Sequence, residues 1–552
     1  MGQHQEGEVR PGDYDGDYDA VVIGAGFAGL YMLYRLREAG FSVRGVEAGS
    51  GVGGTWYWNR YPGARCDSES MYYSYSFLPD LEQEWPLEER YPGQPEILRY
   101  LEHVADRLDL KKDFEFDTRV ASLQFDDRSG RWTVSTDDGA SVKARWVITA
   151  VGCLSAANIP ELPGADSFTG ATYHTGQWPH EPVRFEGQRV GVIGTGASGI
   201  QAIPVIAEQA AHLTVFQRTA QFTIPAANGP LAPAFVQLWK DNYREWRRRG
   251  RLSRAGIPYV GMDRSALEVT PEERRAAFEA GWEQGGFMFS VATFSDLLLN
   301  EEANATAVEF VHAKIDQIVE DPRVADALKP RDFPFATKRL PLDTNYYETF
   351  NRPNVTLVDL RRTPIVEVTR DAIRTTESVH AVDIMVYATG FDALTGPLLA
   401  MDVRGRDGRS LAETWAEGPR TYLGLGIPGF PNLFTITGPG SPSVLSNMPT
   451  AIEQHVEWIA HCLERLAHDR VDIIEATEEA AASWTDHVQQ VASRTLYTKA
   501  ASWYLGANIP GKPRVFLPYV GGLGVYGEKC AEVAARGYEG FALASVQLTS
   551  SP

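Results

Sequence analysis

The sequence lacks the features that mark several large classes of protein. It contains only four cysteines in 552 residues, and no two of them form a Cys-x-x-Cys pair: Cys66, Cys153, Cys462 and Cys530. This pattern argues against a disulfide scaffold, a thiol redox centre and a cysteine zinc site. We therefore expect no metal site, and the low cysteine content fits a reducing cytoplasm.

Long apolar runs and an excess of positive charge are also absent. No run approaches the ~20 residues that a membrane span requires, so no membrane association is expected. The formal net charge of −20 argues against nucleic acid or an anionic membrane as a partner. The N-terminus shows no apolar core of a signal peptide, and we expect residues 1–17 to form a flexible tail.

The chain is nevertheless rich enough in apolar residues to form buried cores. Hydrophobic residues make up 43% of the sequence and aromatic residues 11%. Because 552 residues exceed what one core normally supports, we expect two to four domains.

The first informative motif lies close to the N-terminus. An apolar run, 18–23, leads directly into Gly24-x-Gly26-x-x-Gly29, and apolar residues at helical spacing follow. A strand, a glycine turn and a helix place backbone N–H groups and the positive end of the helix against a pyrophosphate. A second strand, 42–46, ends in Glu47, where an acidic side chain binds a ribose 2′-hydroxyl. This arrangement suits FAD.

A second motif of the same kind follows later, with one difference. Residues 189–193 lead into Gly194-x-Gly196-x-x-Gly199, but the next strand, 213–216, ends in Gln217-Arg218-Thr219 and not in an acidic residue. An arginine at that position accommodates a 2′-phosphate, which a carboxylate would repel. The second site is therefore predicted to bind NADP and not NAD.

Other stretches indicate which segments line these two sites and which segments lie between them. Residues 53–67 begin with two adjacent glycines and continue with clustered aromatics that could line a flat ligand or form plain core. Residues 230–334 read as helical, with a capping box at Thr270–Glu273. Residues 383–390 predict a strand that closes the second nucleotide domain, and a helix is expected to begin near Met448.

The stretch between the two glycine motifs identifies a family. It reads Phe168-x-Gly170-x-x-x-His174-x-x-x-Trp178-Pro, and it resembles the fingerprint of type I Baeyer–Villiger monooxygenases. These enzymes use FAD and NADPH to insert one oxygen of O2 beside a ketone carbonyl. The resemblance covers about residues 18–545 and is closest to the phenylacetone and steroid monooxygenase branch.

The resemblance implies roles for residues throughout the chain. The implied flavin contacts beyond Gly24, Gly26, Gly29 and Glu47 are Gly54, Thr55, Trp56, Asp67, Tyr73, Val120 and Met448. The implied NADP contacts are Gly194, Thr195, Gly196, Ala197, Ser198, Gly199, Arg218, Thr219, Lys338, Arg339 and Trp503. The implied substrate wall is Ser443, Val444 and Leu445.

The resemblance also implies a catalytic pair. The reaction proceeds through a C4a-peroxyflavin that must remain an anion, and an arginine can stabilise that anion without giving up its proton. Arg339 is expected in this role, with Asp67 orienting it. His174 and Trp178 are expected to set the relative placement of the two nucleotide domains without touching the substrate.

The expected fold is α/β, with two Rossmann-like dinucleotide-binding domains, for FAD and NADP, and an inserted helical subdomain. After the tail, the expected segments are 18–152 and 391–552 for FAD, 153–229 (with the linker) and 335–390 for NADP, and 230–334 for the helical insertion. The expected protein is a cytoplasmic monomer or weak homo-oligomer that acts on aryl, cyclic or bulky, steroid-like ketones.

Three alternatives remain beside this interpretation. A flavin-containing monooxygenase that oxidises amines or sulfides would share both glycine motifs, although its linker lacks the Trp178-Pro ending. A non-enzymatic NADP-binding sensor would not explain the flavin stretch. A pyridine nucleotide-disulphide reductase would need a cysteine pair near the flavin, and the sequence has none.

Overall fold

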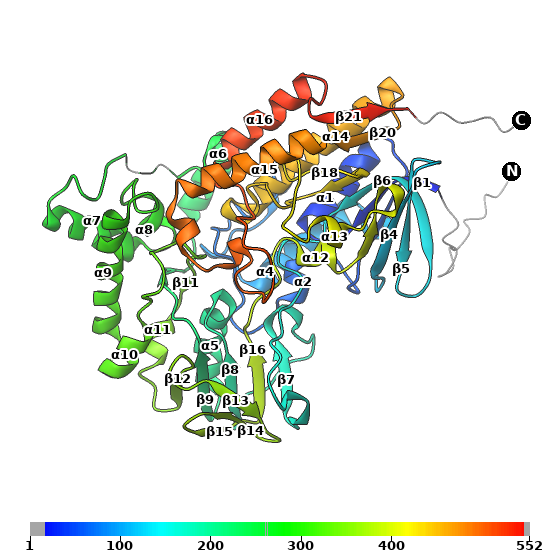
Figure 1. The fold of residues 1–552 in the computed structure, drawn as a ribbon. Helices are drawn as coiled ribbons and strands as arrows, with labels where there is room; N and C mark the ends of the chain where they lie inside the picture. Colours follow the sequence, from blue (N-terminus) through cyan, green and yellow to red (C-terminus); the bar gives the residue numbers. More distant parts are fainter. Residues whose placement is uncertain (1–16, 260, 262, 546–552) are drawn as a thin grey trace, which may run out of the picture.

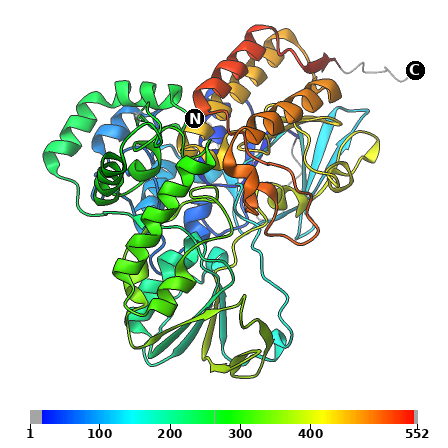
Figure 2. The same cartoon turned by 60° about the vertical axis from the view of Figure 1, so that its left-hand side comes forward.

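The computed structural model describes residues 17–259, 261 and 263–545. The N-terminal tail that the sequence predicts lies outside the described residues except for Asp17, which begins the first strand. Figure 1 shows one lobe built around a large sheet at the upper right, a second sheet in the lower lobe, and a group of helices at the left. Figure 2 shows the same three parts from another side.

The first sheet carries the first glycine motif. Its central strand β1 (Asp17–Ile23) lies between β2 (Val43–Val46) and β6 (Ser141–Thr149), and both pairings are parallel. The end of β6 thus returns the chain to the centre of the sheet, beside the strand that leads into the glycine turn. The full order is β17-β4-β5-β6-β1-β2-β3, with β19 (Phe430–Thr435) parallel to the end of β6.

Helices from both ends of the chain cover this sheet. Helix α1 (Phe27–Glu38) packs against α14 (Met448–Asp469), which in turn contacts α16 (Leu523–Ala535). Their apolar faces share one core with β1 and β6. The predicted helix start near Met448 is confirmed. The first sheet and the helices that cover it are called the first half of the molecule. This half is assembled from sequence regions more than 400 residues apart, as the hydrogen bond between Tyr31 and Glu457 illustrates (separation 426).

The second sheet is smaller and entirely parallel, and this sheet with its helices is called the second half of the molecule. Its order is β12-β9-β8-β16-β7, with β8 (Arg189–Ile193) at its centre and α5 (Ala197–Gln209) following the glycine turn. The strand predicted at 383–390 is confirmed as β16 (Ile384–Tyr387). The parallel order and the strand–turn–helix units are those of a Rossmann-like domain.

The predicted linker is partly a strand. Residues Ala171–His174 form β7, the edge strand of the second sheet, with His174 opposite Tyr387 of β16. A 3₁₀ turn, Thr175–Gln177, follows. The linker is thus more than a connection, because hydrogen bonds to β16 build its central part into the second nucleotide-binding unit.

Two chain crossings join the first sheet to the second, and they lie side by side. The backbone N–H of Asp392 donates to the carbonyl of Ala156 (2.8 Å), and that of Leu394 donates to the carbonyl of Cys153 (2.8 Å). An isolated antiparallel bridge joins Ala157 and Phe391 between them. The connection between the halves is therefore a pair of hydrogen-bonded segments with one isolated bridge between them.

The helical region between β10 (Ile224–Pro225) and β11 (Leu342–Asp343) divides its contacts between the two halves. Helices α7 (Pro271–Gln284) and α9 (Glu301–Ile318) join the core of the second half, and the predicted capping box of Thr270 and Glu273 is confirmed at the start of α7. Helix α6 (Pro233–Leu252) instead packs on α16 and α3 of the first half. The domain boundaries remain a prediction.

Among the remaining helices, α4 (Gln94–Arg107) and α15 (Glu478–Ser493) add buried residues to the core of the first half, and the others are short. The short helices are α2 (Thr55–Trp58), α3 (Pro79–Glu84), α8 (Met288–Val291), α10 (Pro322–Leu328), α11 (Tyr346–Thr349), α12 (Gly396–Leu399) and α13 (Leu411–Thr414).

The remaining strands complete the two main sheets or form small ones. They are β3 (Phe114–Glu115), β4 (Val120–Asp126), β5 (Arg131–Thr136), β9 (His212–Gln217), β12 (Val355–Asp359), β13 (Ile365–Val368), β14 (Ala372–Thr375), β15 (Val379–Ala381), β17 (Asp402–Arg404), β18 (Gly426–Ile427), β20 (Ile473–Ala476) and β21 (Phe541–Ala544). Over residues 17–259, 261 and 263–545, no helix has the length and apolar character needed to cross a membrane.

Candidate active site

One large cavity reaches both glycine motifs. Its volume is about 1030 Å³, which falls at the upper end of the range for cofactor sites. It is lined by the turns after β1 and β8, by the start of α14, and by the segment that holds Lys338 and Arg339. The two halves of the molecule therefore open onto the same space.

The first glycine turn is shaped by close backbone contacts. Gly24 has φ +107°, and a Cβ at that position would lie 2.5 Å from the carbonyl oxygen of Ala150. A Cβ on Gly29 would lie 1.7 Å from the carbonyl oxygen of Gly24. Gly24 and Gly26 line the cavity, whereas Gly29 does not and instead lets α1 pack against the turn.

The second glycine turn repeats this geometry. Gly194 has φ +109°, and a Cβ on Gly199 would lie 2.5 Å from the carbonyl oxygen of Gly194. A Cβ on Gly196 would meet no atom within 4 Å. The cavity wall runs continuously from Gly194 to Ser198 and omits Gly199. Gly196 thus leaves open space in which a ligand phosphate could approach the turn.

Glu47 directly follows β2 and lines the cavity. Its two carboxylate oxygens accept the backbone N–H groups of Ala25 (2.7 Å) and Gly49 (2.7 Å). Burial raises the pKa of the Glu47 carboxyl, although both backbone donors oppose this shift. Each oxygen has a second lone pair, so the group retains acceptor capacity toward the cavity.

The end of β9 carries positive charge where β2 carries Glu47. Arg218 and Lys338 both line the cavity, as does Thr219, whose carbonyl accepts the Thr195 hydroxyl (3.0 Å). Burial, and then the charge of Arg218, lower the pKa of Lys338. Two cations that repel one another at a cavity wall form a site suited to an anion.

Aromatic residues wall the first half of the cavity. Gly54 (φ +53°) precedes α2, whose Trp56 donates its indole N–H to the Tyr73 hydroxyl (3.2 Å). Thr55, Trp56 and Tyr73 line the cavity, as do Gly54, Val120 and Met448. The sequence left open whether these aromatics line a ligand site or form plain core. The structure shows both, because Trp56 and Tyr73 pack in the core and also line the cavity.

Arg339 and Asp67 form an ion pair that joins the two halves. The Nε and Nη2 groups of Arg339 donate to the same oxygen of Asp67, at 2.8 and 2.6 Å. The Nη1 group donates to the carbonyl of Val444 (3.0 Å), and the guanidinium lies 5.1 Å from the centre of the Phe287 ring. Burial acts to lower the pKa of Arg339, but the charge of Asp67 outweighs it and the pKa is raised. Arg339 therefore remains a cation at the cavity wall.

The stretch expected to form the substrate wall is a buried 3₁₀ turn, Ser443–Leu445. Val444 lines the cavity, whereas Ser443 and Leu445 do not. Ser443 is fully buried, and Leu445 packs in an apolar cluster with Met448 and Trp503. Only the central residue of the three thus faces the cavity, and its carbonyl also holds Arg339.

None of the four fingerprint residues of the linker lines the cavity. Phe168 and Gly170 lie beside β7, and a Cβ on Gly170 would lie 2.2 Å from the carbonyl oxygen of Asp383. His174 accepts the backbone N–H of Gly176 (2.9 Å) and lies edge-on to Phe391. Trp178 is buried in the second core, and its backbone N–H donates to the carbonyl of Trp58 (3.3 Å).

Sequence reasoning missed the contact between α5 and the loop before Asp67. Gln201 accepts the Tyr61 hydroxyl (2.8 Å) and donates to the carbonyl of Arg65 (3.0 Å). A Cβ on Gly63 would lie 2.4 Å from the backbone oxygen of Gln201. A glutamine within a helix gives no signal of this kind, because the contact exists only once the two halves have docked.

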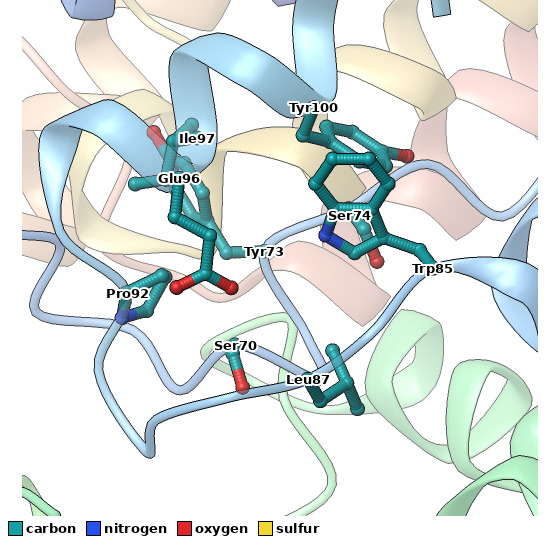
Figure 3. A pocket seen from close by; sticks show the side chains of 9 residues that line it. All are labelled: Ser70, Tyr73, Ser74, Trp85, Leu87, Pro92, Glu96, Ile97 and Tyr100. Carbon is teal, nitrogen blue, oxygen red and sulfur yellow. The ribbon is translucent and has the colours of Figure 1, made fainter. Parts of the chain in front are cut away.

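A second, much smaller pocket lies beside Tyr73, a residue that also lines the large cavity. Figure 3 shows it between α4 and the loops on either side, with the Glu96 carboxylate pointing into it. Its volume is about 10 Å³, which is at the lower limit for a single water molecule. This pocket is too small for a substrate or cofactor.

The fold and the shared cavity define an oxidoreductase class with two dinucleotide-binding units, and comparison with known proteins narrows it. Residues 21–237 match the family model described as pyridine nucleotide-disulphide oxidoreductase. Since all four cysteines are free, this match concerns the nucleotide-binding fold.

Individual relatives are similar along nearly the whole chain. The sequence is 44% identical over 525 residues to a Baeyer–Villiger monooxygenase of Pseudooceanicola batsensis, covering 95% of each protein. It is 45% identical over 531 residues to a phenazine N-monooxygenase of Lysobacter antibioticus, covering 96% of this chain and 97% of the relative. A solved structure of oxidized steroid monooxygenase bound to NADP is 54% identical, with a TM-score of 0.92 over 96% of this chain and 100% of the other. The chain belongs to the type I Baeyer–Villiger monooxygenase family.

Proposed function

We propose that this enzyme uses FAD and NADPH to insert one oxygen of O2 beside the carbonyl of an aryl, cyclic or bulky ketone, giving an ester or lactone. The observation that carries the proposal is the Arg339–Asp67 pair, a fixed cation on the wall of a cavity that both glycine motifs share. The family relationship supports the reaction type, and the similarity to a steroid monooxygenase supports a bulky substrate.

The first half has the features that FAD requires. The Gly24–Gly29 turn offers backbone N–H groups to a pyrophosphate, Glu47 offers a carboxylate to a ribose, and Trp56 and Tyr73 offer flat apolar walls. When bound, FAD supplies the redox chemistry and the activation of O2. Val120 and Met448 complete the proposed contacts.

The second half has the features that NADPH requires. The wall from Gly194 to Ser198 would receive the pyrophosphate, with Gly199 allowing α5 to approach the turn. Arg218 and Lys338, with Thr219 beside them, would hold the 2′-phosphate, because a phosphate relieves the repulsion between the two cations. Trp503 would contact the other end of the coenzyme.

Arg339 would stabilise the negative charge on the oxygen that attacks the ketone. Its raised pKa means that it can hold an anion without protonating it. Asp67 lines the cavity beside Arg339 and accepts hydrogen bonds from its guanidinium, so its proposed role is to position that group. Val444 contributes to the proposed ketone wall, with Ser443 and Leu445 supporting it from behind.

A second candidate function is N-oxidation of a ring nitrogen in a heteroaromatic substrate. It is favoured by the 45% identity to a phenazine N-monooxygenase. We further propose a cytoplasmic monomer or weak homo-oligomer, on the basis of the net charge of −20 and the sparse cysteines.

The test is a substrate panel with purified FAD-loaded enzyme. Cyclohexanone, an aryl acetone, a steroid ketone and phenazine are supplied with NADPH and O2, and both NADPH consumption and products are measured. We expect ester or lactone from at least one ketone. Formation of an N-oxide without any ester would favour the second candidate, and NADPH oxidation that yields only hydrogen peroxide with every substrate would contradict both.

A further inference from the structure

Ser502 presents an unused hydroxyl at the cavity wall. It precedes the 3₁₀ turn Trp503–Leu505 at the position where a serine normally caps the turn, yet its side chain makes no capping hydrogen bond. The residue is only 3% exposed, and within the described part of the chain its Oγ atom has no hydrogen-bond partner. Ser502 lines the cavity.

Asn508 presents a second unused polar atom at the same wall. Its Nδ2 group donates to the carbonyl of Phe391 (2.7 Å), which fixes the orientation of the amide because a carbonyl can only accept. The Oδ1 atom is therefore turned to the other side. It is buried and lacks a partner among the residues that the structure describes.

The two atoms belong to one compact loop. The backbone N–H of Ala507 donates to the carbonyl of Ser502 (3.0 Å), so that the chain returns on itself and both residues line the cavity. Buried polar groups in native proteins are almost always paired, because an unpaired one loses its hydration without compensation. A hydroxyl and an amide oxygen left unpaired at a cavity wall indicate a ligand that brings hydrogen-bond donors.

The surroundings show which end of the cavity this loop faces. Tyr504 packs in the same apolar cluster as Val444, and the carbonyl of Val444 accepts a hydrogen bond from Arg339. The Arg339 charge also acts on the buried Tyr504 phenol. The loop thus lies beside the proposed reaction centre and presents neutral groups, in contrast to the cationic pair formed by Arg218 and Lys338.

We propose that Ser502 and Asn508 form a polar subsite for the nicotinamide riboside end of the coenzyme. The ribose hydroxyls and the carboxamide N–H of that group supply the donors that the two side chains lack. This inference rests on the proposed function, since it takes NADPH as the coenzyme. It separates the binding of the two ends: Arg218 and Lys338 hold the 2′-phosphate, and the Ser502–Asn508 subsite holds the end that reacts.

Asn508 also gives the subsite a connection to the linker. Its Nδ2 bond reaches Phe391, which lies on the second chain crossing and packs against His174. Lys512, further along the same loop, donates to the carbonyl of Ala393 (2.9 Å) on that crossing. Coenzyme bound at Asn508 Oδ1 therefore joins the loop to the crossing between the two halves.

The experiment measures equilibrium binding to the FAD-loaded full-length enzyme by titration calorimetry. Two ligands are compared: NADP⁺, and 2′,5′-ADP, which keeps the 2′-phosphate and lacks the nicotinamide riboside. For Ser502→Ala and for Asn508→Ala we expect the Kd of NADP⁺ to rise about 3- to 10-fold, the scale of one lost hydrogen bond. The Kd of 2′,5′-ADP is expected to stay within about twofold of the unmodified value.

Two control variants make the result specific. Thr495→Val removes a buried hydroxyl that already donates to the carbonyl of Ala492 (2.7 Å), and it should leave both Kd values unchanged. Arg218→Ala should weaken both ligands. If Arg218→Ala behaves as expected while Ser502→Ala and Asn508→Ala leave NADP⁺ binding unchanged, or weaken 2′,5′-ADP equally, the subsite is wrong. If Arg218→Ala weakens neither ligand, the proposed coenzyme site itself is wrong.

Discussion

The two glycine turns share their backbone geometry and differ in charge. In both, the first glycine has a φ near +108° and the third lies against the backbone oxygen of the first (1.7 and 2.5 Å from a notional Cβ). The strand beside the turn ends in Glu47 in the first half and in Gln217-Arg218 in the second. The glycines thus shape the turn in both halves, and we propose that the residue at the end of the neighbouring strand distinguishes the ligands.

The halves also differ in what stands opposite the turn. In the first half Gly54 is close enough that a Cβ on Gly26 would lie 3.3 Å from its Cα, whereas the space beyond Gly196 is open to 4 Å. The first site is therefore the more enclosed one. This difference is consistent with a cofactor that stays bound in the first half and a coenzyme that exchanges in the second.

The largest expected effect concerns the residue pair that spans the two halves. Arg339→Ala should still bind FAD and oxidise NADPH, but ester formation should fall at least ~100-fold, the scale for removing one preorganised charge. Arg339→Lys should not restore it, because an ammonium lacks the planar fork that reaches Asp67 and Val444 together. Product yield per NADPH consumed is the measurement. Normal ester yield in the alanine variant would show that Arg339 is not catalytic.

The next effect tests the difference in charge directly. Arg218→Ala should reduce the preference for NADPH over NADH by about 1.5–3 kcal/mol, the worth of a hydrogen bond to a charged group. The preference is obtained from kcat/KM with each coenzyme. An unmodified enzyme that uses both coenzymes equally would contradict the assignment of the second site.

The shared geometry can be tested with two matched glycine substitutions. Gly29→Ala places a methyl group 1.7 Å from the carbonyl oxygen of Gly24, and it should destabilise the protein by about 1–3 kcal/mol, as overpacking does. Gly196→Ala meets no protein atom and should change stability by less than ~0.5 kcal/mol, while weakening NADP⁺ binding. Denaturant unfolding and coenzyme titration measure the two effects. Equal destabilisation by both substitutions would mean that the turns are not built as described.

The smallest expected effect concerns the linker. His174→Ala or Trp178→Ala should lower the fraction of NADPH oxidation coupled to oxygenation by about fivefold, corresponding to about 1 kcal/mol, while FAD remains bound. The proposed reason is that His174 packs against Phe391 and the Trp178 backbone bonds to Trp58, whereas neither residue lines the cavity. Unchanged coupling in both variants would show that this stretch only connects the two halves and does not influence the reaction.

The sequence predicts the parts of this molecule that depend on local order. Strand, glycine turn and helix follow one another within ~20 residues, so periodicity and spacing are enough to place β1, α1, β8 and α5. The capping box of Thr270 and Glu273 is equally local. Arg339 and Asp67 were paired only through the family resemblance, because 272 residues separate them.

The features that escape prediction arise from tertiary contacts. The linker stretch 171–174 has no more strand character than many loops, and it becomes β7 because the edge of β16 is free to pair with it. Helix α6 lies in sequence beside α7, yet its Arg247 binds Glu82 of the first half (2.8 Å). The unused hydroxyl of Ser502 is visible only once the loop has folded back on itself.

The order of the strands in the first sheet also bears on how the protein is synthesised. Strand β19 pairs with the end of β6, and the Thr149 hydroxyl donates to the carbonyl of Phe434, 285 residues later. On the ribosome, the second sheet has all its strands, from β7 to β16, before β19 emerges. Because domains fold as their sequence becomes available, the second half can fold while Val147–Thr149 at the end of β6 still lack their neighbour on one side. Completing that side of β6 is a late, long-range step, and a chain truncated before Phe430 would leave it open to aggregation.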